Sequence, residues 1–173
     1  GKSLVDVLKS DRSGQVDPSR TWVVTGRERH VAAARAGRLP YPQRALRTPD
    51  YLYIVNFKPE RWPMGDPLRI EDGETPDYAA LRENTFVTFA DLDASPTKAW
   101  VVTHRNEAPY HKYYDFAFAK RPGEELYVLA QDPDQIENVT ETPEYQATRR
   151  DLRSRLLTEL RRLNDPRVVG DGS

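Results

Sequence analysis

The sequence predicts an α+β fold, in which a small antiparallel sheet of about four strands packs with helices and the last helix is long. Two observations carry this prediction. Short runs of β-branched and aromatic residues are separated by turn residues, which is typical of strands. Leucines recur at helical spacing over residues 142–163. No repeat or low-complexity stretch interrupts the chain, so we expect one domain over residues 1–173.

Four runs of the sequence are predicted to be strands. The first covers residues 22–25 and ends at Gly26. Residues 43–48 and 51–57 are predicted to form an antiparallel hairpin, because the residues between them are typical of a turn. The fourth strand is expected over residues 124–129.

Capping residues mark the predicted helices. Ser95 fits an N-cap, and Pro96 fits the first position of the helix that follows. Thr142 is the expected N-cap of the terminal helix over residues 142–163, whose outer face is rich in arginine. Prolines and glycines break any regular pattern over residues 58–77, so we expect a long surface loop there, a place where function often resides.

Composition excludes several classes of protein. The chain is 38% apolar and 31% charged, as in soluble globular proteins. Its 26 basic and 27 acidic residues leave a formal net charge of -1, so we expect no nucleic-acid partner, and its apolar runs are too short to span a membrane. The absence of cysteine excludes disulfides, thiolate nucleophiles and Cys-ligated zinc. The chain opens at Gly1 without a methionine, which favours a product boundary or an excised fragment.

Charged residues at predicted strand ends are the candidate substrate-pocket residues. Glu28, Arg29 and His30 follow the first strand, beside Arg27, and this group could hold a sulfate or a sugar carboxylate through charge-assisted hydrogen bonds. The plain alternative is a solvated loop. Arg44, in the Tyr-Pro-Gln-Arg segment, is a second anion candidate, and its alternative is an arginine paired with a carboxylate. Antiparallel pairing would bring Arg44 to the same edge of the sheet as residues 28–30.

Other groups favour structural roles. Asp91 and Asp93 could form a carboxylate pair or a metal site, but their place before Ser95 favours support of a helix N-terminus. His104 and His111 lack a third histidine nearby and do not indicate a metal site.

Two further motifs could serve either a functional or a structural role. The segment from Trp62 to Gly65 could wall a sugar ring or pin its loop to the core, and both interpretations stay open. Asn138-Val139-Thr140 matches the glycosylation pattern, although local turn bonds of Asn138 are favoured. No glycine-rich phosphate loop, nucleophile elbow or zinc signature is present, so the sequence predicts no catalytic residue.

The order of several segments resembles the C-terminal third of sulfatases, most closely the heparan N-sulfatase-like branch. The resemblance runs over nearly the whole chain. Val128 departs from it, because an aspartate is usual there. The segments that carry it are Gly1-Lys2-Ser3-Leu4, Thr25-Gly26-Arg27-Glu28-Arg29-His30, Tyr41-Pro42-Gln43-Arg44, residues 51–57, and Glu125-Leu126-Tyr127 with Asp132-Pro133 and Glu137-Asn138-Val139.

The resemblance implies a C-terminal subdomain that packs on an α/β catalytic domain of the same parent chain and helps wall the pocket for a sulfated sugar or an aryl sulfate. In sulfatases, formylglycine formed within a Cys/Ser-x-Pro-x-Arg motif and a bound calcium carry the chemistry, in the N-terminal domain. Neither the motif nor the calcium ligands occur in this sequence, and Asp17-Pro18-Ser19-Arg20 lacks the spacing. The chain is therefore expected to be inactive alone, with no cofactor of its own.

The resemblance also implies an apolar face left exposed where the catalytic domain packs. It favours a periplasmic, secreted or lysosomal setting. A stand-alone carbohydrate- or protein-binding module with the same sheet is the alternative.

Overall fold

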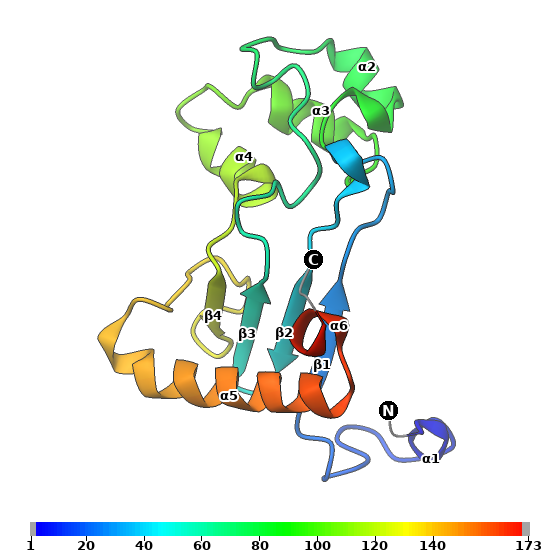
Figure 1. Ribbon diagram of the computed structural model, residues 1–173, viewed down its shortest axis with the longest axis vertical. Coiled ribbons are helices and arrows are strands. Elements are labelled where there is room, and N and C mark those ends of the chain that lie inside the picture. The colour runs from blue at the N-terminus through cyan, green and yellow to red at the C-terminus, as the bar shows by residue number, and fades with distance from the viewer. Residues whose placement is uncertain (1–2, 171–173) are drawn as a thin grey trace.

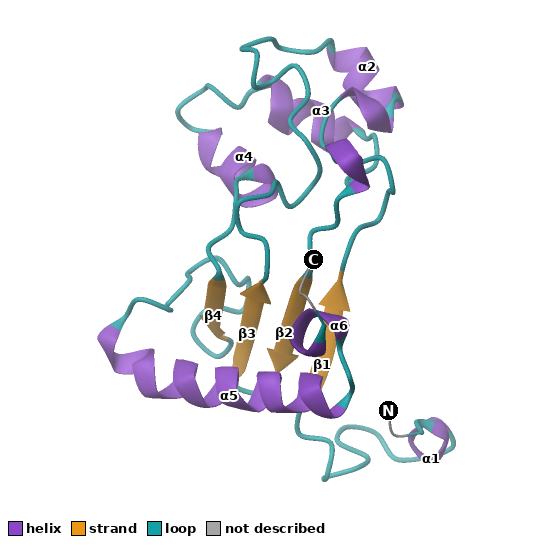
Figure 2. Cartoon of the chain, viewed as in Figure 1, coloured by secondary structure: helices purple, strands orange, loops and turns teal. Residues whose placement is uncertain are grey.

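The computed structural model describes residues 3–170, so that Gly1 and Lys2, which open the sulfatase-like pattern, and residues 171–173 lie outside the described residues. A sheet with a long helix across it forms one part of the molecule, and shorter helices form a lobe beyond one end of the strands (Figure 1 and Figure 2). The elements in chain order are α1 (Val5–Leu8), β1 (Val23–Arg27), η1 (Ala36–Arg38), β2 (Gln43–Arg47), β3 (Tyr51–Asn56), α2 (Tyr78–Glu83), η2 (Thr85–Val87), α3 (Pro96–Thr103), α4 (His111–Phe118), β4 (Glu124–Val128), η3 (Pro143–Tyr145), α5 (Gln146–Arg162) and α6 (Pro166–Val169).

The four strands form one antiparallel sheet in the order β1-β2-β3-β4, which confirms the predicted α+β fold. Cross-strand pairs join Val24 to Leu46, Leu46 to Tyr53, and Tyr53 to Leu126. Because side chains alternate between the two faces of a strand, these four residues form a row on one face. The hairpin of β2 and β3 is also confirmed, closed by Thr48, whose backbone N donates to Tyr51 O at 2.9 Å.

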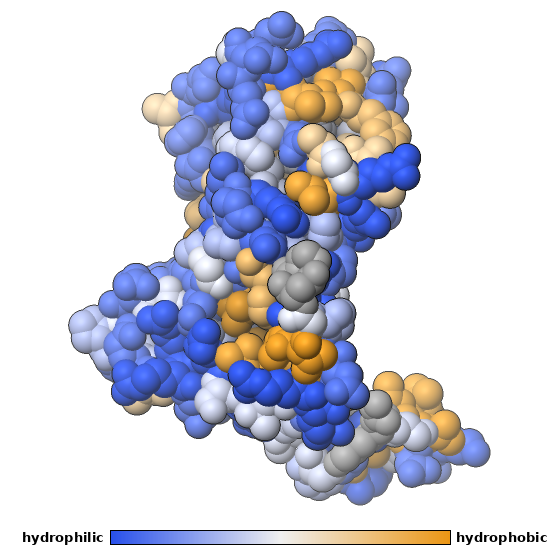
Figure 3. All heavy atoms as spheres, viewed as in Figure 1, coloured by the Kyte–Doolittle hydropathy of each residue, from blue (hydrophilic) through white to orange (hydrophobic). Residues whose placement is uncertain are grey.

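Helix α5 covers that row and makes the first hydrophobic core. Its Leu152, Leu156 and Leu160 come one turn apart and pack on the sheet, and none is more than 4% exposed. Burying such a side chain contributes roughly 1.5–3 kcal/mol. The predicted long terminal helix is thus present, and hydrophilic side chains cover much of its outer face (Figure 3).

The two ends of α5 differ from the sequence prediction. Thr142 makes no side-chain cap, and the segment enters α5 through the 3-10 turn η3. The side chain of Gln146 instead donates to the carbonyl oxygens of Thr140 and Thr142 at 2.6 and 3.2 Å. Beyond α5 the chain turns at Asn164, and the carboxylate of Asp165 caps α6 by accepting from the backbone N of Arg167 at 2.9 Å.

The helical lobe, formed by residues 57–122 together with the segment between β1 and β2 (Figure 1), has a core of its own. Phe89 and Phe118 stack with ring centroids 4.3 Å apart, and Leu81, Ala99 and Val102 complete the buried cluster. Ser95 caps α3 as predicted, because its Oγ accepts from Lys98 N at 3.1 Å. Between Asn56 at the end of β3 and Tyr78 at the start of α2, the chain has neither helix nor strand. Within the described residues, no helix is both long and apolar enough to cross a bilayer.

The second face of the sheet lies away from α5 and α6, which both lie on the other side (Figure 1). Val23, Ala45, Leu52 and Ile54 point to this second face, because they alternate with the residues that pack on α5. Val23 is 49% exposed, Leu52 and Ile54 are half-buried, and Ala45 is buried. We refer to these four residues and their surroundings as the open face.

Candidate functional site

Glu28 and Arg44 meet at one end of the sheet, as the antiparallel pairing of β1 and β2 predicts. Gly26 pairs with Arg44 in register. Nη2 of Arg44 donates to Oε1 of Glu28 at 2.8 Å, and its Nε donates to Oδ2 of Asp165 at 2.7 Å. Arg167 closes the group by donating from Nη2 to Oε2 of Glu28 at 2.6 Å. These four residues form what we call the strand-end network.

The strand-end network is internally balanced. It contains two guanidinium groups and two carboxylates, and the side chain of Arg44 is 9% exposed. Partial burial raises the pKa of Glu28, but hydrogen bonds from Arg167 and Arg44 outweigh it and leave this pKa below its usual value. Burial likewise raises the pKa of Asp165, but the hydrogen bond from Arg44 outweighs burial, so this pKa is also lowered. Arg44 is therefore paired with carboxylates, which was the plain alternative for this residue.

Gly26 allows Arg44 to lie flat across β1. A Cβ at this position would come 2.9 Å from Cδ of Arg44. Hydrogen bonds hold that side chain at both ends, since Nη1 also donates to the carbonyl oxygens of Gln43 and Arg27 at 2.9 and 3.3 Å. A side chain at position 26 would therefore displace the guanidinium from the strand-end network.

Arg29 and His30, the other two predicted pocket residues, turn to different partners. Nη1 of Arg29 donates to the carbonyl oxygen of Arg38. The ring of His30 is 61% exposed, and its Nε2 lies 3.6 Å from Oδ1 of Asp93. The structure thus brings Glu28 and Arg44 into direct contact and places the side chains of Arg29 and His30 in contacts outside the strand-end network.

Asp91 organises the loop that carries His30. Its side chain is fully buried, and its Oδ1 accepts from the backbone N of His30 at 3.0 Å and of Val31 at 2.8 Å. Its Oδ2 lies 2.7 Å from Nη2 of Arg35. Asp91 has a structural role, as predicted. The predicted role was support of the N-terminus of the next helix, but the carboxylate instead holds the loop of His30 and Val31.

The remaining predicted residues have structural contacts. The ring of Trp62 packs edge-on against Phe89 at 6.2 Å, and its Nε1 donates to Glu71 at 3.0 Å, so it pins its loop to the lobe core. Asn138 makes the predicted turn bond, because its Oδ1 accepts from Thr140 N at 3.1 Å, and the same oxygen also accepts from Leu126 N of β4 at 3.0 Å. No group of three or more His, Cys, Asp or Glu side chains that could hold a metal ion occurs among residues 3–170.

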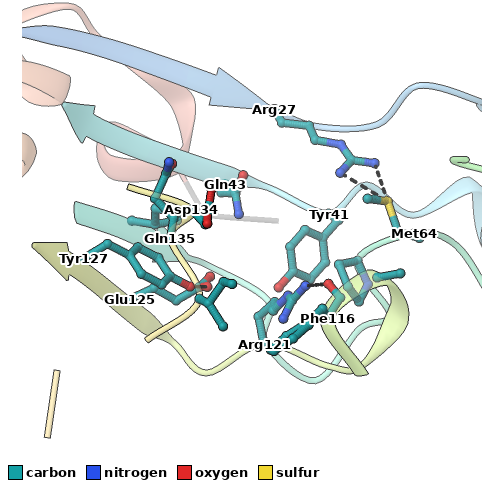
Figure 4. Close-up of a pocket in the computed structure, with 14 residues that line it drawn as sticks. Arg27, Tyr41, Gln43, Met64, Phe116, Arg121, Glu125, Tyr127, Asp134 and Gln135 are labelled. Carbon is teal, nitrogen blue, oxygen red and sulfur yellow. Dashed lines mark hydrogen bonds between the residues drawn. The ribbon is translucent and has the colours of Figure 1, made fainter. Parts of the chain in front are cut away.

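A cavity that the sequence did not indicate lies between the open face and the helical lobe. Its volume is about 390 Å³, which falls within the range of small-molecule sites. It is lined by side chains from all four strands, from the Pro63-Met64 loop, from α4 and from residues 134–136 (Figure 4). The polar side chains in its wall are Arg27, Tyr41, Gln43, Arg121, Glu125, Tyr127, Asp134 and Gln135.

No protein-family model and no curated protein matches this sequence.

Proposed function

We propose that this chain is the C-terminal part of a sulfatase, a hydrolase of sulfuric esters or sulfamates. In this proposal it packs on a catalytic α/β domain of the same parent chain and walls the pocket for a sulfated sugar or an aryl sulfate. The parent would work in a periplasmic, secreted or lysosomal setting. The order of sulfatase-like segments along the sequence suggests it, and one feature of the fold supports it most, namely the open face.

The open face has the character of a surface that another layer covers. Domains are built of layers that bury the apolar side of each sheet, and α5 provides such a layer on one side. The other side carries Val23, Leu52 and Ile54, and Val23 is about half exposed. Apolar residues that gather on a partly exposed sheet face are typical of an interface. A catalytic domain seated there would supply the second layer.

Within this proposal the candidate residues divide into two roles. His30 has an exposed ring, and Arg29 lies beside it on the same loop, so both can reach a bound anion. Glu28 and Arg44 position that loop, because their ion pair ties the end of β1 to β2 and to α6. None of the four takes part in bond cleavage.

In this proposal the catalytic domain of the parent protein would carry out the hydrolysis. Formylglycine would supply the nucleophile and calcium the charge stabilisation, both outside this chain. In this proposal the calcium is held by the catalytic domain, and the residues of this chain only shape the pocket.

The test begins with the coding sequence upstream of this chain. We expect it to encode a Cys/Ser-x-Pro-x-Arg motif in the same reading frame. The parent and the 173-residue chain are then assayed with an aryl sulfate and an N-sulfated glucosamine, with and without calcium. The parent should turn over one of these substrates in a calcium-dependent manner, and the chain alone should turn over neither. A parent without the motif, or turnover by the chain alone, contradicts the proposal.

A further inference from the structure

The cavity beside the open face has a buried hydroxyl group that lacks a protein partner. Tyr41 is 1% exposed, and no donor or acceptor among the described residues bonds to its hydroxyl. Figure 4 shows this hydroxyl pointing into the cavity, towards the side of Glu125 and Arg121. A buried hydroxyl without a partner destabilises the fold relative to one that is bonded, because it has lost its hydrogen bonds to water without replacement. A bound ligand with a hydrogen-bonding group would remove this cost.

A buried carboxylate lies in the same cavity. Glu125 is 5% exposed, and its Oε1 accepts from Nδ2 of Asn56 at 2.7 Å while its Oε2 accepts from Tyr127 Oη at 2.6 Å. Each carboxylate oxygen can accept a further hydrogen bond. Glu125 is thus a fixed acceptor in the lining of the cavity, held in place by Asn56 and Tyr127.

Two guanidinium groups, those of Arg27 and Arg121, supply donors in the lining of the cavity. Both Nη atoms of Arg27 donate to the sulfur of Met64 at 3.5 Å, and sulfur is a weak acceptor. Nη2 of Arg27 also lies 3.7 Å from Oδ2 of Asp91. Arg121 donates from Nη2 to the carbonyl oxygen of Phe116. Because a guanidinium has five N–H donors, both arginines keep donors for a ligand.

The charges of the lining balance. Arg27 and Arg121 carry two positive charges, and Glu125 and Asp134 carry two negative ones. No excess charge therefore selects an anion or a cation. The lining instead offers both donors and acceptors, together with the rings of Tyr41, Phe116 and Tyr127 (Figure 4).

We propose that this cavity binds one uncharged sugar ring. A sugar hydroxyl both donates and accepts, so a ring with several hydroxyls can bond to Glu125, to an arginine and to the hydroxyl of Tyr41 at once. The C–H faces of the ring are apolar and pack on aromatic side chains. The cavity of about 390 Å³ is large enough for a single ring. This inference stands apart from the proposed function, because it needs neither a catalytic domain nor a sulfate group.

The test is a binding experiment on the whole chain. Glucose, galactose, mannose, N-acetylglucosamine and their β1,4-linked disaccharides are added at millimolar concentrations. Saturation-transfer NMR and amide chemical shifts report binding. We expect at least one sugar to bind and to shift the amides around Tyr41, Glu125 and Arg121. Inorganic sulfate and acetate, as anion probes, should leave these amides unchanged.

Variants then separate binding from folding. Tyr41→Phe removes only the unpartnered hydroxyl, so the melting temperature should not fall, whereas sugar affinity should drop about tenfold. Tyr53→Phe is the matched control. Tyr53 is equally buried, on the α5 side of the sheet, and its hydroxyl donates to Glu124 at 2.7 Å, so this variant should lose stability and keep sugar affinity.

Several results would overturn the inference. They are the absence of binding by every sugar of the panel, equal affinity in Tyr41→Phe and the wild type, shifts confined to residues away from the cavity, or binding of the anions in place of the sugars. A sugar-binding chain whose parent hydrolyses no sulfate would remove the proposed function and leave this site in place. A parent that is an active sulfatase and a chain that binds no sugar would do the reverse.

Discussion

Nε of Arg44 donates to Oδ2 of Asp165 at 2.7 Å, across 121 positions of the sequence. The bond joins the second strand to the residue that caps the last helix, α6. Glu28 and Arg167 complete the network, so that the C-terminal segment is fixed to the same end of the sheet that carries the candidate pocket loop. Contacts of this kind make the position of the loop depend on the C-terminal segment.

Replacement of Arg44 by alanine should destabilise the fold. It would leave the carboxylates of Glu28 and Asp165 partly buried without one of their cations, and removal of one partner from such a network costs about 3 kcal/mol. Urea denaturation of the wild type and of Arg44→Ala measures the difference.

Arg162→Ala is the control for this prediction. Arg162 also pairs with a carboxylate, that of Glu159, but its side chain is 64% exposed. Its removal should change the free energy of unfolding by less than about 1 kcal/mol. Equal stability of the two variants would show that the strand-end network does not hold the C-terminal segment.

Local patterns made much of the fold predictable. The leucines at helical spacing, the turn at Thr48-Pro49-Asp50 and the cap at Ser95 each depend on residues close in sequence, and the structure has all three. The antiparallel pairing of the first two strands was also expected from the sequence, and it brings Arg44 to the end of the sheet where Glu28 lies.

The partners of the charged side chains could not be predicted in the same way. Arg44 is an equally good ligand for a sulfate or for a carboxylate, and its choice depends on Asp165, far along the chain. The cavity is harder still to predict, because its wall combines Arg27, Tyr41, Arg121 and Glu125 with residues of other segments. Tyr41 and Glu125 both belong to the sulfatase-like segments, but a sequence pattern does not show that their side chains line the same cavity.

The buried Lys98 should make stability rise with pH in the alkaline range. Its ammonium group donates to the carbonyl oxygens of Thr85, Phe89 and Leu92 at 3.2, 3.2 and 2.7 Å. Burial lowers the pKa of Lys98 from 10.5 to about 8. Between these two values the unfolded chain binds more protons than the folded one, so this group favours folding more as pH increases.

Comparison of the wild type with Lys98→Met isolates this effect. From pH 8 to 9.5, the free energy of unfolding of the wild type should rise by about 1–2 kcal/mol relative to that of the variant. Urea denaturation at several pH values gives both curves. Parallel curves would mean that the ammonium group of Lys98 titrates near its ordinary pKa in the folded chain.

Glu124 should contribute stability that is lost in acid. Its carboxylate accepts from Tyr53 Oη and Arg149 Nε at 2.7 and 2.8 Å and from Arg153 Nε at 3.1 Å, so it ties α5 to the sheet. Partial burial raises the pKa of Glu124, but the hydrogen bonds from Arg149 and Tyr53 outweigh it, and the pKa is lowered. A lowered pKa stabilises the fold above the unfolded value, and the contribution is lost as pH falls through the folded value.

Glu124→Gln should therefore cost about 2 kcal/mol at pH 7 and less as the solution becomes acidic. Thermal unfolding of both proteins between pH 7 and pH 3 follows the convergence. Glu137→Gln, on the loop after β4 and exposed, should match the wild type throughout. A cost for Glu124→Gln that stays constant down to pH 3 would contradict the assignment of a lowered pKa.

His30→Ala should weaken substrate binding by the parent enzyme without loss of stability, a prediction that rests on the proposed function. The bonds that hold this loop run from the backbone N of His30 to Asp91, and alanine keeps them. The imidazole is 61% exposed, and as a contact for an anionic sugar its loss should raise KM about tenfold. His111→Ala is the control, because His111 is 57% exposed and pairs with Asp115 on α4. Steady-state kinetics of the parent carrying each change measures the difference. Equal KM values in the two variants would remove His30 from the pocket wall, and a fall in melting temperature for His30→Ala alone would assign its ring a structural role.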